Sequence, residues 1–123
     1  MKIIDAITTI DAIKPNSYPI QMKVRWLSLL DGKVKKELID THEGGENVEF
    51  SGYTQESLDQ TLLVPAPYDD MYIKWLEAQI DYANGEYGKY NNTITMYNNA
   101  YITYSKAYHR EHLPKNTAKF TNF

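Results

Sequence analysis

Two short clusters of titratable side chains are the places where this sequence could carry out chemistry. His109 and His112 flank Arg110 and Glu111, and two histidines with a glutamate between them are typical of helical zinc sites. Those sites need histidines four residues apart and a further ligand, whereas these histidines are three residues apart and no third ligand is evident. We therefore expect no metal here and interpret the cluster as the positively charged last turn of a helix, which suits the helix dipole.

The second cluster is the acidic pair Asp69 and Asp70, which could serve as a metal or acid–base pair. Consecutive residues of a helix point in different directions, so these two carboxylates cannot easily share one ligand. Their position after Pro65 and Pro67 predicts the first turn of a helix, where negative charge is favourable.

Other catalytic signatures are missing from the sequence. Gly44 and Gly45 are followed by glutamates and by no lysine, so they do not form a phosphate-binding loop. The serines have no nucleophile-elbow context. We expect no catalytic residue and no bound cofactor, and we expect that the protein is not an enzyme.

Charge and composition narrow the possible partners. The chain has 123 residues and a net charge of -3, which predicts one domain and disfavours a nucleic-acid binder with a broad basic face. One basic cluster, formed by Lys33, Lys35 and Lys36, faces Glu37 and Asp40. A solvated helix face with local ion pairs is the simplest interpretation, and contact with DNA is the alternative. No cysteine is present, and no signal peptide or membrane span is expected.

Apolar periodicity predicts four helices that would position these groups. Ile3, Ile7, Ile10 and Ile13 indicate a helix that ends at Lys14-Pro15. A second pattern runs from residue 19 to 38, and a glycine at position 32 weakens it by about 1 kcal/mol, so that helix is expected to bend or end there. A third helix follows Pro67 and stops at residues 84–85, and a fourth runs to residue 112. We expect an all-α, small four-helix domain with a C-terminal helical hairpin.

Residues 42–66 lack a helical period and predict a long irregular arm, with a short β-hairpin as one option. Structureless loops of more than about 12–15 residues are uncommon and usually functional. We therefore expect the arm to contact a partner through Val48, Phe50 and Tyr53, and we expect deletion of Gly44 to Ser57 to leave the helices folded.

Tyrosine is the unusual residue of the chain, with 11 of the 16 aromatic side chains. On the fourth helix the spacing alternates between three and four residues, which places the aromatic side chains along one seam. A base-stacking platform would also need a cationic groove, so we favour packing in the core or between subunits, with the seam partly buried by neighbours. The members of this tyrosine seam are Tyr87, Tyr90, Ile94, Tyr97, Tyr101, Tyr104 and Tyr108.

The domain is expected to cover residues 1–113, followed by a flexible polar tail over 114–123 that exposes two phenylalanines. The predicted protein-interface residues come from the arm, the seam and this tail. They are Val48, Phe50, Tyr53, Tyr97, Tyr101, Tyr104, Tyr108, Phe120 and Phe123.

Several segments resemble one viral family. They are LVPAP at residues 63–67, YIKWL at 72–76 and IDYANGEYGKYNNT at 80–93, with IKPN at 13–16 and a tryptophan at position 26. Together they resemble the head-tail connector proteins, also called head completion or adaptor proteins, of tailed phages and prophages of Gram-positive bacteria. The resemblance is dense over residues 62–114 and loose before them. Residues 42–61 and the tail after residue 114 do not match closely enough for contacts of the family to be assigned to them.

The resemblance implies a structural subunit of phage morphogenesis, located in the virion at the head-tail interface and in the bacterial host cytoplasm during assembly. Such a subunit would form a homo-oligomeric ring beneath the portal protein and extend the DNA channel. It would also bind the next neck, stopper or tail protein, while DNA passes nearby without specific binding. A mildly acidic chain suits such a conduit, because a cationic lumen would retard the phosphates. The alternative is a small helical phage regulatory or nucleic-acid-binding protein.

Overall fold

A computed structural model describes residues 1–115 and contains four α-helices, as the periodicity predicts. Within these residues no β-strand occurs, and three short helical turns connect the second and third helices. The elements are α1 (Ile3–Ile13), α2 (Ile20–Val34), η1 (Lys35–Ile39), η2 (Gly45–Asn47), η3 (Gln55–Ser57), α3 (Asp70–Ala83) and α4 (Tyr87–Glu111).

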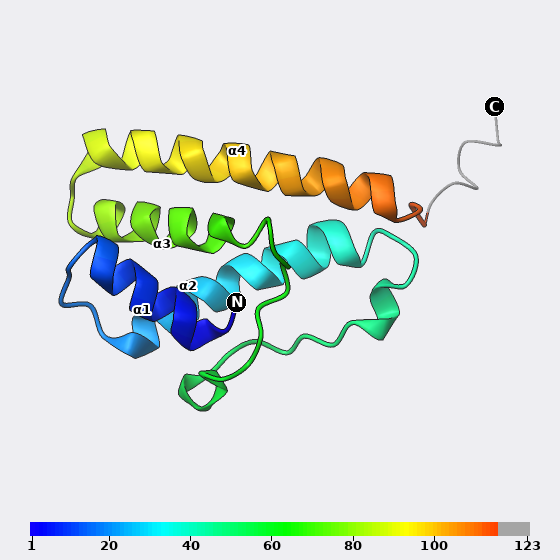
Figure 1. Cartoon of the computed structure of the whole chain (residues 1–123), viewed down its shortest axis with the longest axis horizontal. Helices are drawn as coiled ribbons and strands as arrows, with labels where there is room; N and C mark the ends of the chain where they lie inside the picture. The colour runs from blue at the N-terminus through cyan, green and yellow to red at the C-terminus, as the bar shows by residue number, and fades with distance from the viewer. Residues whose placement is uncertain (116–123) are drawn as a thin grey trace.

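The last two helices form the predicted hairpin, and they lie side by side and antiparallel in Figure 1. The turn between them uses Gly85 in the left-handed region, with a φ of 74°, a conformation that favours glycine. The Glu86 amide then donates to the Asp81 carbonyl at 2.9 Å, which directs the chain back into α4. The predicted stop at residues 84–85 is confirmed.

α3 is the central helix of the fold, because α4 covers one side of it while α1 and α2 cover the other (Figure 1). The apolar spacing of the sequence predicts one buried stripe along this part of the chain, formed by Tyr68, Tyr72, Trp75, Leu76, Ile80 and Ala83. Tyr72, Leu76 and Ile80 are buried, Tyr68 and Trp75 are half-buried, and Ala83 is exposed. Met71 and Ile73 are buried as well. A single-stripe pattern misses them because it assumes that only one face of a helix is covered.

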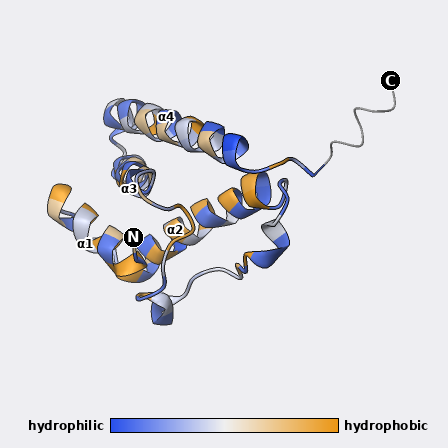
Figure 2. Ribbon diagram, turned by 45° about the vertical axis from the view of Figure 1, so that its right-hand side comes forward, coloured by the Kyte–Doolittle hydropathy of each residue, from blue (hydrophilic) through white to orange (hydrophobic). Residues whose placement is uncertain are grey.

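The isoleucines of α1 supply much of the remaining core. Ile3, Ile7 and Ile10 are buried, whereas Ile13 at the end of the helix is 56% exposed. Figure 2 shows hydrophobic segments gathered on α1 and α2, while α4 carries mixed hydropathy along its whole length. An ion pair of 2.7 Å between Asp11 and the buried Lys23 ties α1 to α2.

The prediction that the second helix bends or ends at Gly32 is wrong. α2 continues through Gly32 to Val34 and then widens into the π-helical turn η1, where the Asp40 amide donates to the Lys35 carbonyl at 2.8 Å. A Cβ placed on Gly32 would lie 3.7 Å from the ring of Phe50. That is an ordinary van der Waals distance, so the arm packs over Gly32 without requiring a glycine there.

The arm over residues 42–66 is part of the fold, which corrects the expectation of a separable segment with a possible hairpin. Its backbone completes the first turn of α1, because the amides of Ile3 and Ile4 donate to the carbonyls of Gln60 and Leu58. Tyr53 is buried in the core, and Val48 and Phe50 pack against that core. Deletion of Gly44 to Ser57 would remove these core contacts, so we no longer expect the helices to survive it.

A buried carboxylate fastens the arm to two helices. Asp31 of α2 is fully buried and accepts hydrogen bonds from the Tyr53 hydroxyl, from the Tyr72 hydroxyl at 2.6 Å and from the Leu63 amide at 3.0 Å. The Tyr72 oxygen in turn accepts from the Val64 amide at 2.8 Å. These bonds, which we call the Asp31 clasp, join α2, α3 and both halves of the arm.

A second buried carboxylate joins the hairpin to α1. Asp81 of α3 is fully buried, pairs with Lys14 at the end of α1 and accepts a hydrogen bond from the Thr93 hydroxyl of α4 at 3.1 Å. None of the helices in residues 1–115 combines the length and the apolar composition that crossing a bilayer requires.

Candidate interaction surfaces

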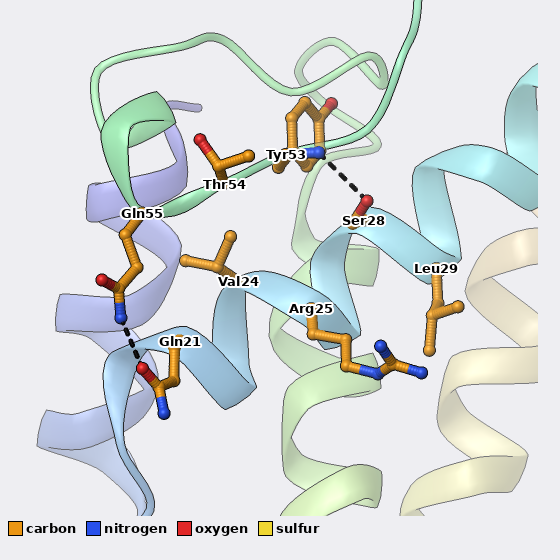
Figure 3. Close-up of a pocket in the computed structure, with 8 residues that line it drawn as sticks. All are labelled: Gln21, Val24, Arg25, Ser28, Leu29, Tyr53, Thr54 and Gln55. Atoms are coloured by element: carbon orange, nitrogen blue, oxygen red, sulfur yellow. Dashed lines mark hydrogen bonds between the residues drawn. The ribbon is translucent and has the colours of Figure 1, made fainter.

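A groove of about 310 Å³ lies between α2 and the arm (Figure 3). Residues of α2 form one wall, and Tyr53, Thr54 and Gln55 form the other. Two hydrogen bonds cross its floor, from the Tyr53 amide to the Ser28 hydroxyl at 3.1 Å and from the Gln55 amide group to Gln21 at 2.7 Å. We call this surface the α2–arm groove.

Two side chains on consecutive turns of α2 give this groove its chemical character. Leu29 is 56% exposed, and Arg25 is exposed beside it (Figure 3). No carboxylate of residues 1–115 lies within ion-pair distance of Arg25. Protein interfaces are enriched in arginine, which offers both a planar face and several donors, and their buried centres are mostly apolar.

The arm residues that the sequence predicts at an interface differ in how exposed they are. Tyr53 is only 7% exposed, and its hydroxyl is part of the Asp31 clasp, so it is not available to a partner. Val48 and Phe50 are half-buried against the core and remain partly accessible. Phe120 and Phe123 lie outside the described residues.

The tyrosine seam packs within its own chain for most of its length. Tyr97, Tyr104 and Tyr108 are buried, and the ring of Tyr97 lies 4.9 Å from that of Trp75 on α3. Tyr101 is partly exposed and donates to Glu37 at 2.8 Å. The seam is therefore an intramolecular core at its C-terminal end, and Tyr101 is the one of its four predicted interface residues that a partner can reach.

Burial raises the pKa of the seam hydroxyls. The pKa of Tyr104 is raised to about 12, chiefly because the phenolate would be poorly solvated, and burial raises the pKa of Tyr97 in the same direction. The Tyr97 hydroxyl has no hydrogen-bond partner among residues 1–115. A buried hydroxyl that has lost its water and gained no partner destabilises the folded state.

Replacing Tyr97 by phenylalanine is expected to raise the free energy of unfolding by about 1 kcal/mol, because the ring contacts stay and the unpaired hydroxyl is removed. Tyr101→Phe is the matched control on the same helix. It removes a hydroxyl that is bonded to Glu37, so it should lower the same quantity by up to about 1 kcal/mol. Urea denaturation followed by circular dichroism measures both. A stability loss in Tyr97→Phe equal to that in Tyr101→Phe would contradict the assignment.

A second aromatic cluster lies at the tip of the hairpin, and the tyrosine spacing on α4 predicted only some of its members. Tyr82 of α3 and Tyr87 of α4 are both more than half exposed, and their rings lie 5.6 Å apart in an edge-on arrangement. The ring of Tyr90 lies 5.2 Å from that of Tyr82. The alternating spacing on α4 did predict that Tyr87 and Tyr90 share a face, but it carried no information about Tyr82.

The basic cluster is mostly engaged inside the chain. Lys33 lies over the ring of Tyr101, with its ammonium 4.6 Å from the ring centroid, and Lys35 pairs with Asp40 and donates to the Gly45 carbonyl. Lys36 is exposed. Two of the three lysines thus have intramolecular partners, which favours the interpretation as a local ion-pair face over DNA contact.

The histidine cluster at the end of α4 gains a member that the sequence did not suggest. His42 is buried, its Nδ1 donates to the Leu38 carbonyl at 2.6 Å, and its Nε2 lies within hydrogen-bond distance, 2.8 Å, of Nδ1 of His109. His112 stacks on Tyr108 with ring centroids 3.9 Å apart. Residues 1–115 contain no group of three ligating side chains placed to hold a metal ion. The sequence separation of 67 positions between His42 and His109 explains why no local pattern links them.

Comparison of this chain with family models, with curated proteins and with solved structures finds no match. The ranking of the surfaces therefore depends on geometry. The α2–arm groove combines exposure, an arginine that pairs with no carboxylate of residues 1–115 and a wall held by internal hydrogen bonds, and we regard it as the first candidate for contact with another protein.

Proposed function

We propose that this chain is a structural subunit of a tailed-phage particle, a head-tail connector that binds beneath the portal protein as a ring and links head to tail. The segments at residues 63–67, 72–76 and 80–93 support the proposal through their resemblance to that family. On this proposal the ring extends the DNA channel and presents a surface to the next neck or tail protein.

The α2–arm groove is the surface through which we propose that the subunit contacts its partner. Its arm wall is fixed by the Asp31 clasp and by the bond between Tyr53 and Ser28, so little ordering is needed when a partner binds. Preorganised surfaces retain more of their contact energy as affinity. Arg25 and Leu29 would make the central contacts with the portal or with a neighbouring subunit.

Charge reversal in the groove tests this assignment. We expect the protein, mixed with the portal protein of its own phage, to form a ring-sized complex in size exclusion with light scattering. Arg25→Glu should weaken the complex at least tenfold, because a central interface arginine typically contributes more than about 1.4 kcal/mol. Lys106→Glu is the matched control, since Lys106 is exposed on α4 outside the groove and the charge change is the same.

The outcomes separate the role of the protein from the role of the groove. Failure of the unmodified protein to associate with the portal at any salt concentration would contradict the connector proposal. A complex that Arg25→Glu and Lys106→Glu weaken equally would leave the connector role and reject the groove. Salt-dependent DNA binding by the unmodified protein, without portal binding, would instead favour the regulatory or nucleic-acid-binding alternative.

A further inference from the structure

The middle of α4 contains no charged side chain. Residues 90–105 are 16 consecutive positions without Asp, Glu, Lys, Arg or His, in a chain of which 24% is charged. By contrast, α2 and α3 carry four charged side chains each along their lengths. We call residues 90–105 the neutral segment. The charged side chains of α4 lie before and after it, at Lys89, Lys106, Arg110 and Glu111.

The solvent face of the neutral segment is uncharged as well. Met96 is 48% exposed and Ile102 is 50% exposed. Protein surfaces normally carry interspersed charges, which keep copies of the same protein from associating. This face offers only apolar, amide and hydroxyl groups, and its other exposed residues are Asn91, Asn92, Thr95, Asn98, Asn99 and Thr103.

The residue types of the neutral segment favour a strand over a helix. Nine of its 16 residues are tyrosine, threonine or isoleucine, which are enriched in β-strands. Only Met96 and Ala100 are strong helix formers. The four asparagines are suited to the amide ladders that form when identical strands stack on one another. The local preference of the segment therefore opposes the helix in which it lies.

Packing on α3 and on the residue that leads into it keeps this segment helical. Tyr97 and Tyr104 are buried, and their rings lie 4.9 Å from that of Trp75 and 5.5 Å from that of Tyr68, respectively. Helices in proteins depend on such tertiary contacts more than on intrinsic propensity. Separation of α4 from α3 would therefore release a segment whose own preference is extended.

We propose that the neutral segment is a self-association site, at which residues 90–105 of one released α4 pair with the same residues of a second copy in a cross-β assembly. Windows of six or seven residues with high β propensity, low charge and no proline form such assemblies, and this segment contains neither proline nor glycine. Stacking in register places each residue on its counterpart, so a segment without charge meets no like-charge repulsion from a copy of itself. Nothing in this self-association requires the connector role.

Partial unfolding of the whole protein tests the self-association. We expect the full chain, incubated at the midpoint of its urea transition, to form fibres that bind thioflavin T and give X-ray reflections at about 4.7–4.8 Å and about 10 Å. Limited proteolysis followed by mass spectrometry should recover residues 90–105 within the protected core. The absence of these reflections, or a protected core elsewhere in the chain, would overturn the proposal.

A matched pair of lysine substitutions separates the neutral segment from the general effect of charge. Thr95 on α4 and Thr8 on α1 are both exposed, and either substitution by lysine moves the net charge of -3 one unit closer to zero. Thr95→Lys should lengthen the lag time of fibre formation by at least about tenfold, because stacked lysines would lie about 4.8 Å apart. Thr8→Lys should leave the lag time unchanged.

Differences in folded stability are removed by the choice of conditions. Each variant is incubated at the urea concentration that unfolds the same fraction of its molecules, as measured by circular dichroism, so that the same share of α4 is released. Equal lag times for Thr95→Lys and Thr8→Lys would show that another part of the chain drives the association, and they would overturn the assignment to residues 90–105.

Discussion

Replacing Asp31 by alanine is expected to lower the free energy of unfolding by about 3 to 5 kcal/mol, a large share of the 5–15 kcal/mol typical of a small domain. The change removes the acceptor of the Tyr53 hydroxyl, the Tyr72 hydroxyl and the Leu63 amide. Each buried donor left without a partner costs about 1–3 kcal/mol. Urea denaturation followed by circular dichroism gives the value.

Two milder variants separate the hydrogen bonds of the clasp from its packing. In Asp31→Asn the amide oxygen must face the Leu63 amide, so the new NH₂ group faces Tyr72, whose hydroxyl hydrogen then loses its acceptor. Tyr72→Phe leaves the Val64 amide without an acceptor. We expect each to lower stability by about 1–3 kcal/mol. If Asp31→Ala lowers the free energy of unfolding by no more than these variants do, the Asp31 clasp is not what holds the arm to the helices.

The ionisation of Asp31 makes the free energy of unfolding depend on pH, and the direction of its pKa shift fixes the sign of that dependence. Burial raises its pKa above the ordinary 3.8, against the opposing hydrogen bonds from Tyr53, Tyr72 and the Leu63 amide. The folded chain therefore keeps this proton to a higher pH than the unfolded chain does. Its contribution to stability is fully present below pH 3.8 and is lost as the pH rises through the folded-state pKa. The stability difference between the native protein and Asp31→Asn should change across that window in this direction.

Lys14→Met is expected to lower the free energy of unfolding by about 3 kcal/mol. The variant leaves the fully buried Asp81 carboxylate with only the Thr93 hydroxyl as its side-chain donor. Removing one partner of a buried pair costs about 3–5 kcal/mol, and the lower value applies because the Lys14 side chain is 24% exposed to water. The midpoint and slope of urea denaturation measure the loss.

A double-mutant cycle tests whether the loss comes from the unpaired charge. Adding Asp81→Asn to Lys14→Met neutralises the carboxylate, so the double variant should be more stable than Lys14→Met alone. Lys2→Met, on the exposed first turn before α1, provides a control for the loss of a lysine and should change stability by less than about 0.5 kcal/mol. Losses that simply add in the double variant would show that Lys14 and Asp81 do not interact energetically.

Local patterns were enough to predict the helices and the hairpin. The spacing of Ile3, Ile7 and Ile10 identified α1, and Gly85 with its left-handed φ marked the turn into α4. These signals work because helical period and turn chemistry act over a few residues. The seam spacing also identified α4 correctly, although it could not show that Tyr97 is buried by Trp75 of α3.

The arm and its contacts could not be predicted in this way, because the groups that hold it are distant in sequence. Asp31 lies 22 residues from Tyr53 and 41 from Tyr72 along the chain. A lone aspartate in a helical pattern is usually a solvated residue, and nothing local distinguishes Asp31 from such a residue. The role of His42 could not be predicted for the same reason, because its partner His109 lies 67 positions away on α4.

The attachment of α1 to the arm has a consequence for synthesis on the ribosome. α1 has 11 residues, which is too short for a stable helix in isolation, and two of its first-turn amides find their acceptors at Leu58 and Gln60. After its last residue, Ile13, this helix must therefore wait until Gln60 has been made, 47 residues later. At about 5–20 residues per second this delay is about 2–9 s. Throughout that interval the isoleucine face of α1 is open to a chaperone or to wrong partners, so this face is where nascent-chain protection should be sought.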